Sequence, residues 1–145
     1  MIPYEWIELA NNRWKENQPY STNNPCKLGV DVAGMGRDNS VLCPRYGNYV
    51  PKFEVHHAAG KAEHMHVVGL VSKYLNEPKD VAFVDTIGEG AGVFSRLIER
   101  GLNAYSCKYS QSAKGLHDIT GQYSFVNMRA FCYWALRDWL NPKNG

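Results

Sequence analysis

The sequence lacks the features that assign a chain to several common classes of protein. Only four of its 145 residues are cysteines, and none forms a C-x-x-C pair among Cys26, Cys43, Cys107 and Cys132. This dispersion argues against a disulfide framework and against a structural zinc site, and it favours reduced thiols. No apolar run reaches the roughly 20 residues that a membrane-spanning helix needs. The N-terminal stretch MIPYEWIELANNRWK carries charges within it and does not have the pattern of a signal peptide.

Strong charge and nucleotide-binding motifs are also missing. The net charge is +2, which is too mild by itself to indicate the clustered basic face of a nucleic-acid-binding domain. The phosphate-binding pattern G-x-x-x-x-G-K-[ST] is absent, which argues against ATP hydrolysis and DNA translocation by this chain. The composition that remains is that of one ordinary globular domain, with 44% hydrophobic and 21% charged residues.

Hydrophobic periodicity and turn residues predict an N-terminal helix followed by an alternation of strands and helices. Three strands in succession favour antiparallel hairpins, and the later alternation with helices favours parallel pairing. The sequence therefore predicts an α/β fold, in which a mixed sheet of three antiparallel strands and then parallel strands is flanked by helices. The expected helices cover 3–15, 61–75, 91–100 and 123–140, and the expected strands cover 28–33, 40–45, 49–58, 81–85 and 103–109.

Two of the predicted strands carry an acid among core residues. Asp31 lies in LGVDVAG and Asp85 ends VAFVD, and a glycine-rich turn follows each of them. An ionised carboxylate in an apolar strand loses hydration unless a partner compensates, and a divalent cation compensates well. If the two strands are neighbours, about 4.8 Å apart, the acids could share one Mg²⁺ or Mn²⁺ or flank two ions about 3.5–4 Å apart. The glycines would let a nucleic-acid backbone approach.

Simpler interpretations of these acids stay open. A single strand aspartate often only accepts hydrogen bonds from a turn, and the repetition of the pattern in a second strand is what favours a site. Asp38, in GRDNS, suits a turn cap, and Glu89, in GEG, suits a solvated loop. Either of them could also reach the metal through a water molecule.

Several segments in order resemble the nuclease domain of tailed-phage terminase large subunits. GVDVAGMGRDNSVLCPRYGNYV resembles its first hairpin, and FVDTIGEGAGVFSRLIERGLNAY resembles its second acidic block. YSFVNMRAFCYWALRDWL is similar to its late helix, and IPYEWIELANNRW is similar to its opening helix. The resemblance covers nearly the whole chain. It implies a ribonuclease H-like fold, with 1–24 as opening helix and linker and 25–145 as the nuclease domain.

The resemblance also implies an activity and a setting. The implied activity is metal-dependent endonucleolytic cleavage of concatemeric double-stranded phage DNA, and Asp31 and Asp85 match the first two metal-binding acids of the family. The implied partners are a packaging ATPase domain, the portal and the small terminase subunit, in the cytoplasm of the bacterial host and without a membrane. The family has a third acid after the late helix. Because this chain has none there, the resemblance implies C-terminal truncation and an incomplete metal site.

Other candidate site residues are weaker. Asp118 is an acid that could serve as a metal ligand, although it does not match the third-acid motif. Arg37, Lys108, Lys114 and Arg129 could contact DNA phosphates, and Arg129 is favoured because the family resemblance covers it. Scattered basic residues are more often ordinary surface residues.

Histidines are concentrated in HHAAGKAEHMH, which contains His56, His57, His64 and His66. Imidazoles bind zinc and nickel well. The first two should point to opposite faces of a strand, however, and the last two are not four residues apart. The spacing therefore favours a solvated, titrating patch.

Two other functions compete with the nuclease. One is a catalytically silent DNA-binding or motor-docking module of the same fold, which a missing third acid would produce. The other is an actin-like or sugar-kinase-like nucleotide-binding domain, whose phosphate loop also follows a strand with Asp and Gly. That family needs a Thr/Ser pair where this chain has Arg37-Asp38-Asn39, so it ranks last. Metal-dependent plasmid nicking separates the first two functions, and nucleotide binding would support the third.

We expect the carboxylates of Asp31 and Asp85 to lie within bridging distance of one cation, roughly 4–7 Å apart. The expectation follows from two strand acids with matching glycine turns, and a metal-bound structure measures the distance. Side chains on distant strands or on opposite faces of the sheet would contradict it.

Overall fold

The computed structural model describes residues 1–19, 21–34, 38–57 and 64–144. The chain divides into two compact units, one of them Ser21–Cys107 and the other joining Met1–Tyr20 to Lys108–Gly145. All five strands of the sheet lie in the first unit. The domain boundary expected between residues 24 and 25 stays a prediction.

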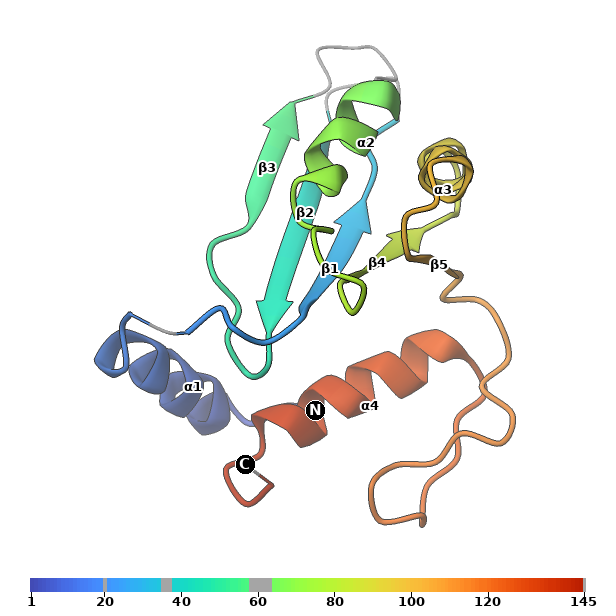
Figure 1. Ribbon diagram of the computed structural model, residues 1–145. Helices are drawn as coiled ribbons and strands as arrows, with labels where there is room; N and C mark the ends of the chain where they lie inside the picture. Colours follow the sequence, from blue (N-terminus) through green and yellow to red (C-terminus); the bar gives the residue numbers. More distant parts are fainter. Residues whose placement is uncertain (20, 35–37, 58–63, 145) are drawn as a thin grey trace. The chain divides into compact units, whose positions relative to one another are not determined.

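The unit Ser21–Cys107 is built on one mixed sheet with the strand order β3-β2-β1-β4-β5 (Figure 1). β2 pairs antiparallel with β1 and β3, whereas β4 pairs parallel with β1 and β5. The predicted mixed sheet, with antiparallel strands followed by parallel ones, is therefore confirmed. The strands are β1 (Cys26–Asp31), β2 (Asn39–Tyr46), β3 (Glu54–His57), β4 (Val81–Asp85) and β5 (Ala104–Cys107).

Two helices, α2 (His64–Ser72) and α3 (Gly90–Glu99), pack against the sheet and enclose its core. Successive side chains of a strand point to opposite faces, and every second residue of β1 is buried. Burying an aliphatic side chain contributes roughly 1.5–3 kcal/mol, so this cluster holds β1 and β4 firmly together. Its members include Leu28, Val30, Ala82 and Val84 from the strands and Val68, Val71, Val93 and Leu97 from the helices.

The second unit contains α1 (Tyr4–Glu16) and α4 (Met128–Leu140). The guanidinium carbon of Arg137 lies 5.3 Å from the ring centroid of Trp6 and 4.8 Å from that of Trp134. This cation–π contact links the two helices. No helix among the described residues combines the length and the apolar character that crossing a bilayer requires.

Most boundaries differ from the predicted ones by one or two residues, and β1 covers 26–31 rather than 28–33, so that Asp31 ends the strand. Three boundaries within the described residues differ by more, each for a local reason. β3 begins at Glu54 rather than at 49, because Tyr46 and Tyr49 exchange backbone hydrogen bonds of 2.8 and 3.0 Å and close a turn. α2 ends at Ser72 rather than at 75, because the next two N–H groups bond three residues back and tighten the last turn. α4 begins at Met128 rather than at 123, because Asn127 Oδ1 accepts a hydrogen bond from a backbone N–H and caps the helix. Residues 58 and 61–63, expected to be structured, lie outside the described residues.

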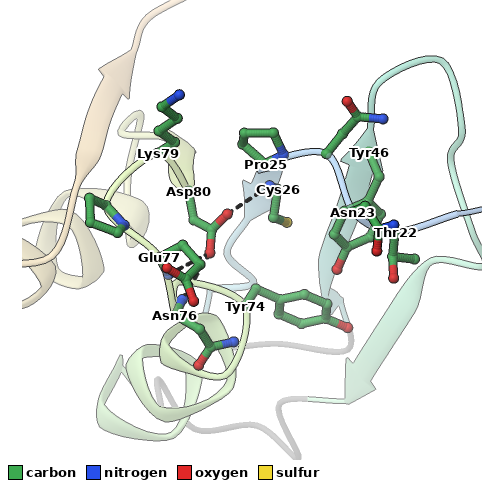
Figure 2. A pocket seen from close by; sticks show the side chains of 12 residues that line it. Thr22, Asn23, Pro25, Cys26, Tyr46, Tyr74, Asn76, Glu77, Lys79 and Asp80 are labelled. Carbon is green, nitrogen blue, oxygen red and sulfur yellow. Dashed lines mark hydrogen bonds between the residues drawn. The ribbon is translucent and has the colours of Figure 1, made fainter.

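Asp80 ties the start of β1 to the start of β4 (Figure 2). One carboxylate oxygen accepts the N–H of Cys26 at 2.8 Å, and the other accepts those of Asn76 at 3.0 Å and Glu77 at 2.8 Å. Burial alone would raise the pKa of Asp80, but these three backbone donors outweigh it and hold the pKa below its ordinary value. The ionised side chain therefore joins the start of β1 to the segment before β4 by hydrogen bonds.

We expect Asp80→Ala to lower the free energy of unfolding by about 2–4 kcal/mol, because it leaves three backbone donors unpaired, of which the N–H of Cys26 is buried. Asp80→Asn keeps one acceptor and should lose less. Since the folded-state pKa is lowered, the stabilisation is complete above the ordinary carboxyl pKa and is lost as the pH falls through the folded value. Urea unfolding at about pH 7 and pH 3 should therefore show a smaller difference between wild type and Asp80→Asn at the lower pH. An equal difference at both would contradict this assignment.

Candidate metal centre

Asp31 and Asp85 are the last residues of β1 and β4, which are neighbouring parallel strands. Both acids therefore lie at the same end of the sheet, called here its edge. The register pairs Val30 with Val84, so each acid is the next residue of its strand. Because Val30 and Val84 belong to the helix-covered core and side chains alternate, both acids point to the opposite face. Neighbouring strands are about 4.8 Å apart, which places the two carboxylates within reach of one cation.

Glycines shape the turn that follows Asp85. The N–H of Ile87 donates to Asp85 Oδ1 at 3.0 Å, and Gly88 has φ +82°, in the left-handed region that favours glycine. α3 then begins so close to the strand that a Cβ on Gly90 would lie 1.7 Å from the carbonyl oxygen of Asp85. Tight packing of helix on strand therefore requires glycine here. A second use for these glycines, the approach of a nucleic-acid backbone, stays a prediction.

The paired acids suit a hard divalent cation. Carboxylate oxygens are the ligands that Mg²⁺ and Mn²⁺ prefer, with water or phosphate oxygens completing the coordination. Asp31 is exposed and Asp85 is half-buried, so solvent reaches both. In the part of the chain that the structure describes, no three histidine, cysteine, aspartate or glutamate side chains come together as a metal site. The two aspartates are thus candidate ligands, and no third candidate joins them among the described residues.

Two further acids lie near this edge. Asp38 is exposed and precedes β2, which runs antiparallel to β1, so it lies at the edge where Asp31 ends its strand. Glu89 precedes α3, and its Cγ lies 3.7 Å from the position of a Cβ on Gly34, in the segment that leaves β1. Oε2 of Glu89 forms a 2.6 Å hydrogen bond with Nε2 of His64. Glu89 is therefore a partnered residue, not only a solvated loop acid, and its contact with a metal through water stays a prediction.

The histidines that are close in sequence take different partners. His56 Nε2 lies 2.7 Å from Glu54 Oε1, and His57 Nδ1 lies 3.1 Å from Asn39 Oδ1. His64 instead pairs with Glu89 of another element, as described above. This pair cannot be predicted from the sequence, because a spacing of 25 residues carries no local signal.

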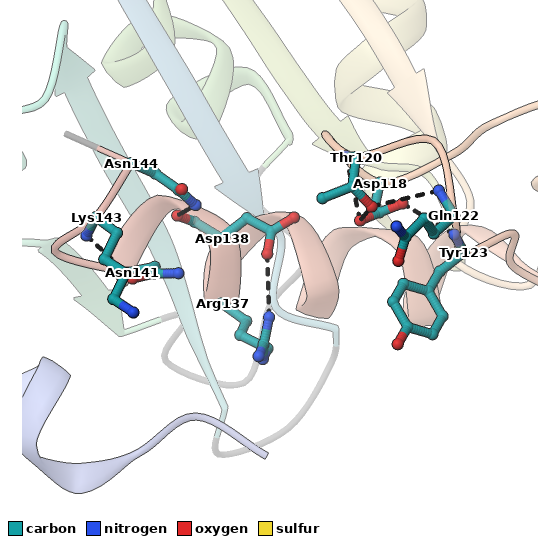
Figure 3. Close-up of polar contacts among 9 residues, drawn as sticks. All are labelled: Asp118, Thr120, Gln122, Tyr123, Arg137, Asp138, Asn141, Lys143 and Asn144. Carbon is teal, nitrogen blue, oxygen red and sulfur yellow. Dashed lines mark hydrogen bonds and ion pairs between the residues drawn. The ribbon is translucent and has the colours of Figure 1, made fainter.

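The two aspartates of the second unit are engaged by their own neighbours (Figure 3). Asp118 Oδ2 accepts the hydroxyl of Thr120 at 2.6 Å, and Oδ1 accepts the N–H of Tyr123 at 2.9 Å. These hydrogen bonds, the Thr120 hydroxyl first, lower the pKa of Asp118. Asp138 is buried in α4, where Oδ1 lies 3.2 Å from Nη1 of Arg137. Asp118 thus organises the segment before α4, and its role as a metal ligand stays a prediction.

The basic candidates do not lie in the described part of the sheet unit. Arg37 lies outside the described residues, and Lys108, Lys114 and Arg129 are exposed residues of the second unit. Arg129 is in the first turn of α4, where the helix dipole disfavours a cation. Helix stability therefore does not account for this arginine, and a role in binding phosphate stays a prediction.

A cavity of about 640 Å³ lies at the opposite edge of the sheet, beside the starts of β1 and β4 (Figure 2). Its lining includes Tyr46, Tyr74 and Lys79 together with Asp80. Asp80 already accepts three backbone hydrogen bonds, so it is not free to bind a cation. The paired acids, rather than this cavity, therefore mark the candidate metal centre.

The chain resembles known proteins in structure rather than in sequence. No family model and no curated protein sequence matches the chain. Among solved structures, the nuclease domain of the large terminase subunit gp2 of bacterial virus Sf6 matches with a TM-score of 0.71 and 23% sequence identity. The match covers 96% of this chain and 63% of that one, so this chain spans less than two thirds of its length.

Two structures of one mutant form of the same Sf6 domain match over the same extent, 96% of this chain and 63% of theirs, at 23% identity. One structure is of the domain with manganese and beta-thujaplicinol and has a TM-score of 0.71. The other is with calcium and has a TM-score of 0.68. Together with the mixed sheet and its flanking helices, these matches confirm the predicted fold: the chain has the ribonuclease H-like fold of the nuclease domain of a phage large terminase subunit.

Proposed function

We propose that this chain is a divalent-metal-dependent endodeoxyribonuclease module of a phage DNA-packaging terminase. The observation that supports it best is the register of β1 and β4, which brings Asp31 and Asp85 to one edge of the sheet. The fold shared with a terminase nuclease domain that has been solved with manganese adds support. The proposed substrate is concatemeric double-stranded phage DNA.

The chain's own residues hold and orient the metal ligands. Asp31 and Asp85 would bind Mg²⁺ or Mn²⁺ through their carboxylate oxygens. When bound, the metal supplies an activated water and stabilises the charge of the leaving oxygen. The Ile87 N–H orients the carboxylate of Asp85, and the close contact at Gly90 fixes the strand end that carries it. Such fixing matters because a misplacement near 1 Å can cost about 10²-fold in rate.

The same resemblance suggests the setting of this activity. The proposed partners are a packaging ATPase domain, the portal and the small terminase subunit, in the cytoplasm of a bacterial host. Because the chain has no phosphate-binding G-x-x-x-x-G-K-[ST] loop, ATP hydrolysis would be the work of the ATPase domain.

One observation favours a second candidate, a catalytically silent DNA-binding or motor-docking module. Within the described residues, no third carboxylate joins Asp31 and Asp85 as a direct ligand. Two-metal cleavage needs both ions held against the scissile phosphate, and two aspartates hold one ion better than two. Cleavage by this chain should therefore be slow, and DNA binding should be retained in either case.

We expect the chain to nick supercoiled plasmid slowly and with a preference for Mn²⁺ over Mg²⁺. Mn²⁺ should bind more tightly than Mg²⁺ to a site that has only two protein ligands. Asp31→Asn and Asp85→Asn should each lower the nicking rate by about 10²-fold or more, because each removes half of the direct protein ligands. Glu99→Gln, an exposed acid paired with Arg96, is the matched control and should nick like the wild type. Nicking that persists in both aspartate variants would contradict the nuclease centre. No nicking by the wild type, with DNA binding intact, would favour the silent module.

We also expect Arg129→Gln to weaken DNA binding and to reduce the slope of log affinity against log salt concentration by about 0.9, the value for one phosphate contact. Fluorescence anisotropy with a labelled duplex at several salt concentrations measures both quantities. Because phosphate contacts carry no base information, the loss should be the same for unrelated duplex sequences. An unchanged slope would remove Arg129 from the DNA interface, and Lys108→Gln and Lys114→Gln test the remaining candidates in the same way.

A further inference from the structure

We propose that Glu89 serves the metal centre without being a direct ligand, and that His64 is the residue that positions it. In this inference, which rests on the proposed function, the Glu89 carboxylate accepts hydrogen bonds from water bound to the cation that Asp31 and Asp85 hold. The His64 imidazole fixes the direction of that carboxylate.

The position of Glu89 is the first support. Asp85 and Glu89 are separated by a turn that the Gly88 backbone and the Gly90 contact fold tightly back over the strand end. The Glu89 side chain then passes beside Gly34, its Cγ 3.7 Å from the position of a Cβ there. Gly34 is in the segment that leaves β1 directly after Asp31. Glu89, four residues after Asp85, thus lies against the segment that follows Asp31.

The contacts of the His64 imidazole are the second observation that supports the inference. Its Nε2 lies 2.6 Å from Glu89 Oε2, and both side chains are about one third exposed, at 33% and 35%. The imidazole also lies over the backbone of Gly92, where a Cβ would come within 2.5 Å of Nδ1 and 2.6 Å of Cε1. Gly92 follows Glu89 by about one helical turn on α3, so one face of this helix both binds the imidazole and makes room for it.

A fixed carboxylate at this place has a chemical use. Hydrated Mg²⁺ and Mn²⁺ keep several waters, and residues that hydrogen-bond those waters orient them and tune the affinity for the ion. The bond to His64 occupies Oε2 alone, so Oε1 is left as an acceptor in the described structure. The negative charge of Glu89 would also add to the attraction that two aspartates provide.

A simpler role for the pair is a clamp between the starts of α2 and α3. A clamp would affect stability when broken, but it would not change how the folded protein binds a cation. Two variants separate the roles. Glu89→Gln keeps an acceptor for His64 and removes only the charge. Gly92→Ala changes neither partner, yet its methyl group would overlap the imidazole, which must leave its present position.

The experiment measures Mn²⁺ affinity of the whole chain by electron paramagnetic resonance of free Mn²⁺, and checks folding by thermal unfolding in EDTA. Glu89→Gln should weaken Mn²⁺ binding by about tenfold, at the low end of the effects seen for residues that support metal ligands. Gly92→Ala should weaken it in the same direction. Glu99→Gln removes an exposed charge at the far end of the same helix and should bind like the wild type.

Each alternative outcome has its own meaning. If folded Glu89→Gln binds Mn²⁺ as tightly as Glu99→Gln, the pair is only a clamp and the inference is wrong. If Glu89→Gln weakens binding and Gly92→Ala does not, the positioning role of His64 is wrong. If Asp31→Asn and Asp85→Asn leave Mn²⁺ binding unchanged, the proposed metal centre itself fails and this inference fails with it.

Discussion

Apolar contacts between β1 and β4 hold two segments that are far apart in the sequence in one fixed register. The hydrogen bond from Cys26 to Asp80, which locks one end of this pairing, spans 54 residues. A slip by one residue would turn every side chain of a strand to the opposite face. It would carry Asp85 into the apolar core and Val84 out of it. The packing of Leu28, Val30 and their partners therefore fixes the two carboxylates as strictly as it fixes the core.

Local patterns are enough to predict much of this architecture. The sequence predicts β4 residue for residue, because VAFVD is a short apolar run between an acid and a glycine-rich turn. It predicts α3 to within one residue at each end, since its apolar positions repeat with helical spacing. Asp31 and Asp85 stand out as candidate ligands because an acid within an apolar strand is costly unless something binds it. That the two strands are neighbours, however, is known only from the structure.

Contacts between helices and strands that are distant in the sequence could not be predicted from it. α4 begins five residues after the predicted start, because isolated bridges such as His117 with Ser124 hold the preceding segment in an extended form. Gly90 is required because a side chain there would collide with the carbonyl oxygen of Asp85, and the motif GEG does not reveal this contact. The hydrogen bond between His64 and Glu89 could not be predicted either, because it depends on how α2 and α3 pack on the sheet.

The strand order also determines which strands can pair first while the chain is being synthesised. β1, β2 and β3 are consecutive and can pair as hairpins while later residues are still being synthesised, but β4 must then add to β1 over a long connection. Such distant parallel pairing is slow, and until it occurs β1 is an open, largely apolar edge. Charged residues on an open edge discourage pairing with other chains. Lys27 and Asp31 are the charged residues of β1. Charges at these two positions would disfavour pairing of the open edge with other chains, which is a use for Asp31 that does not depend on a metal.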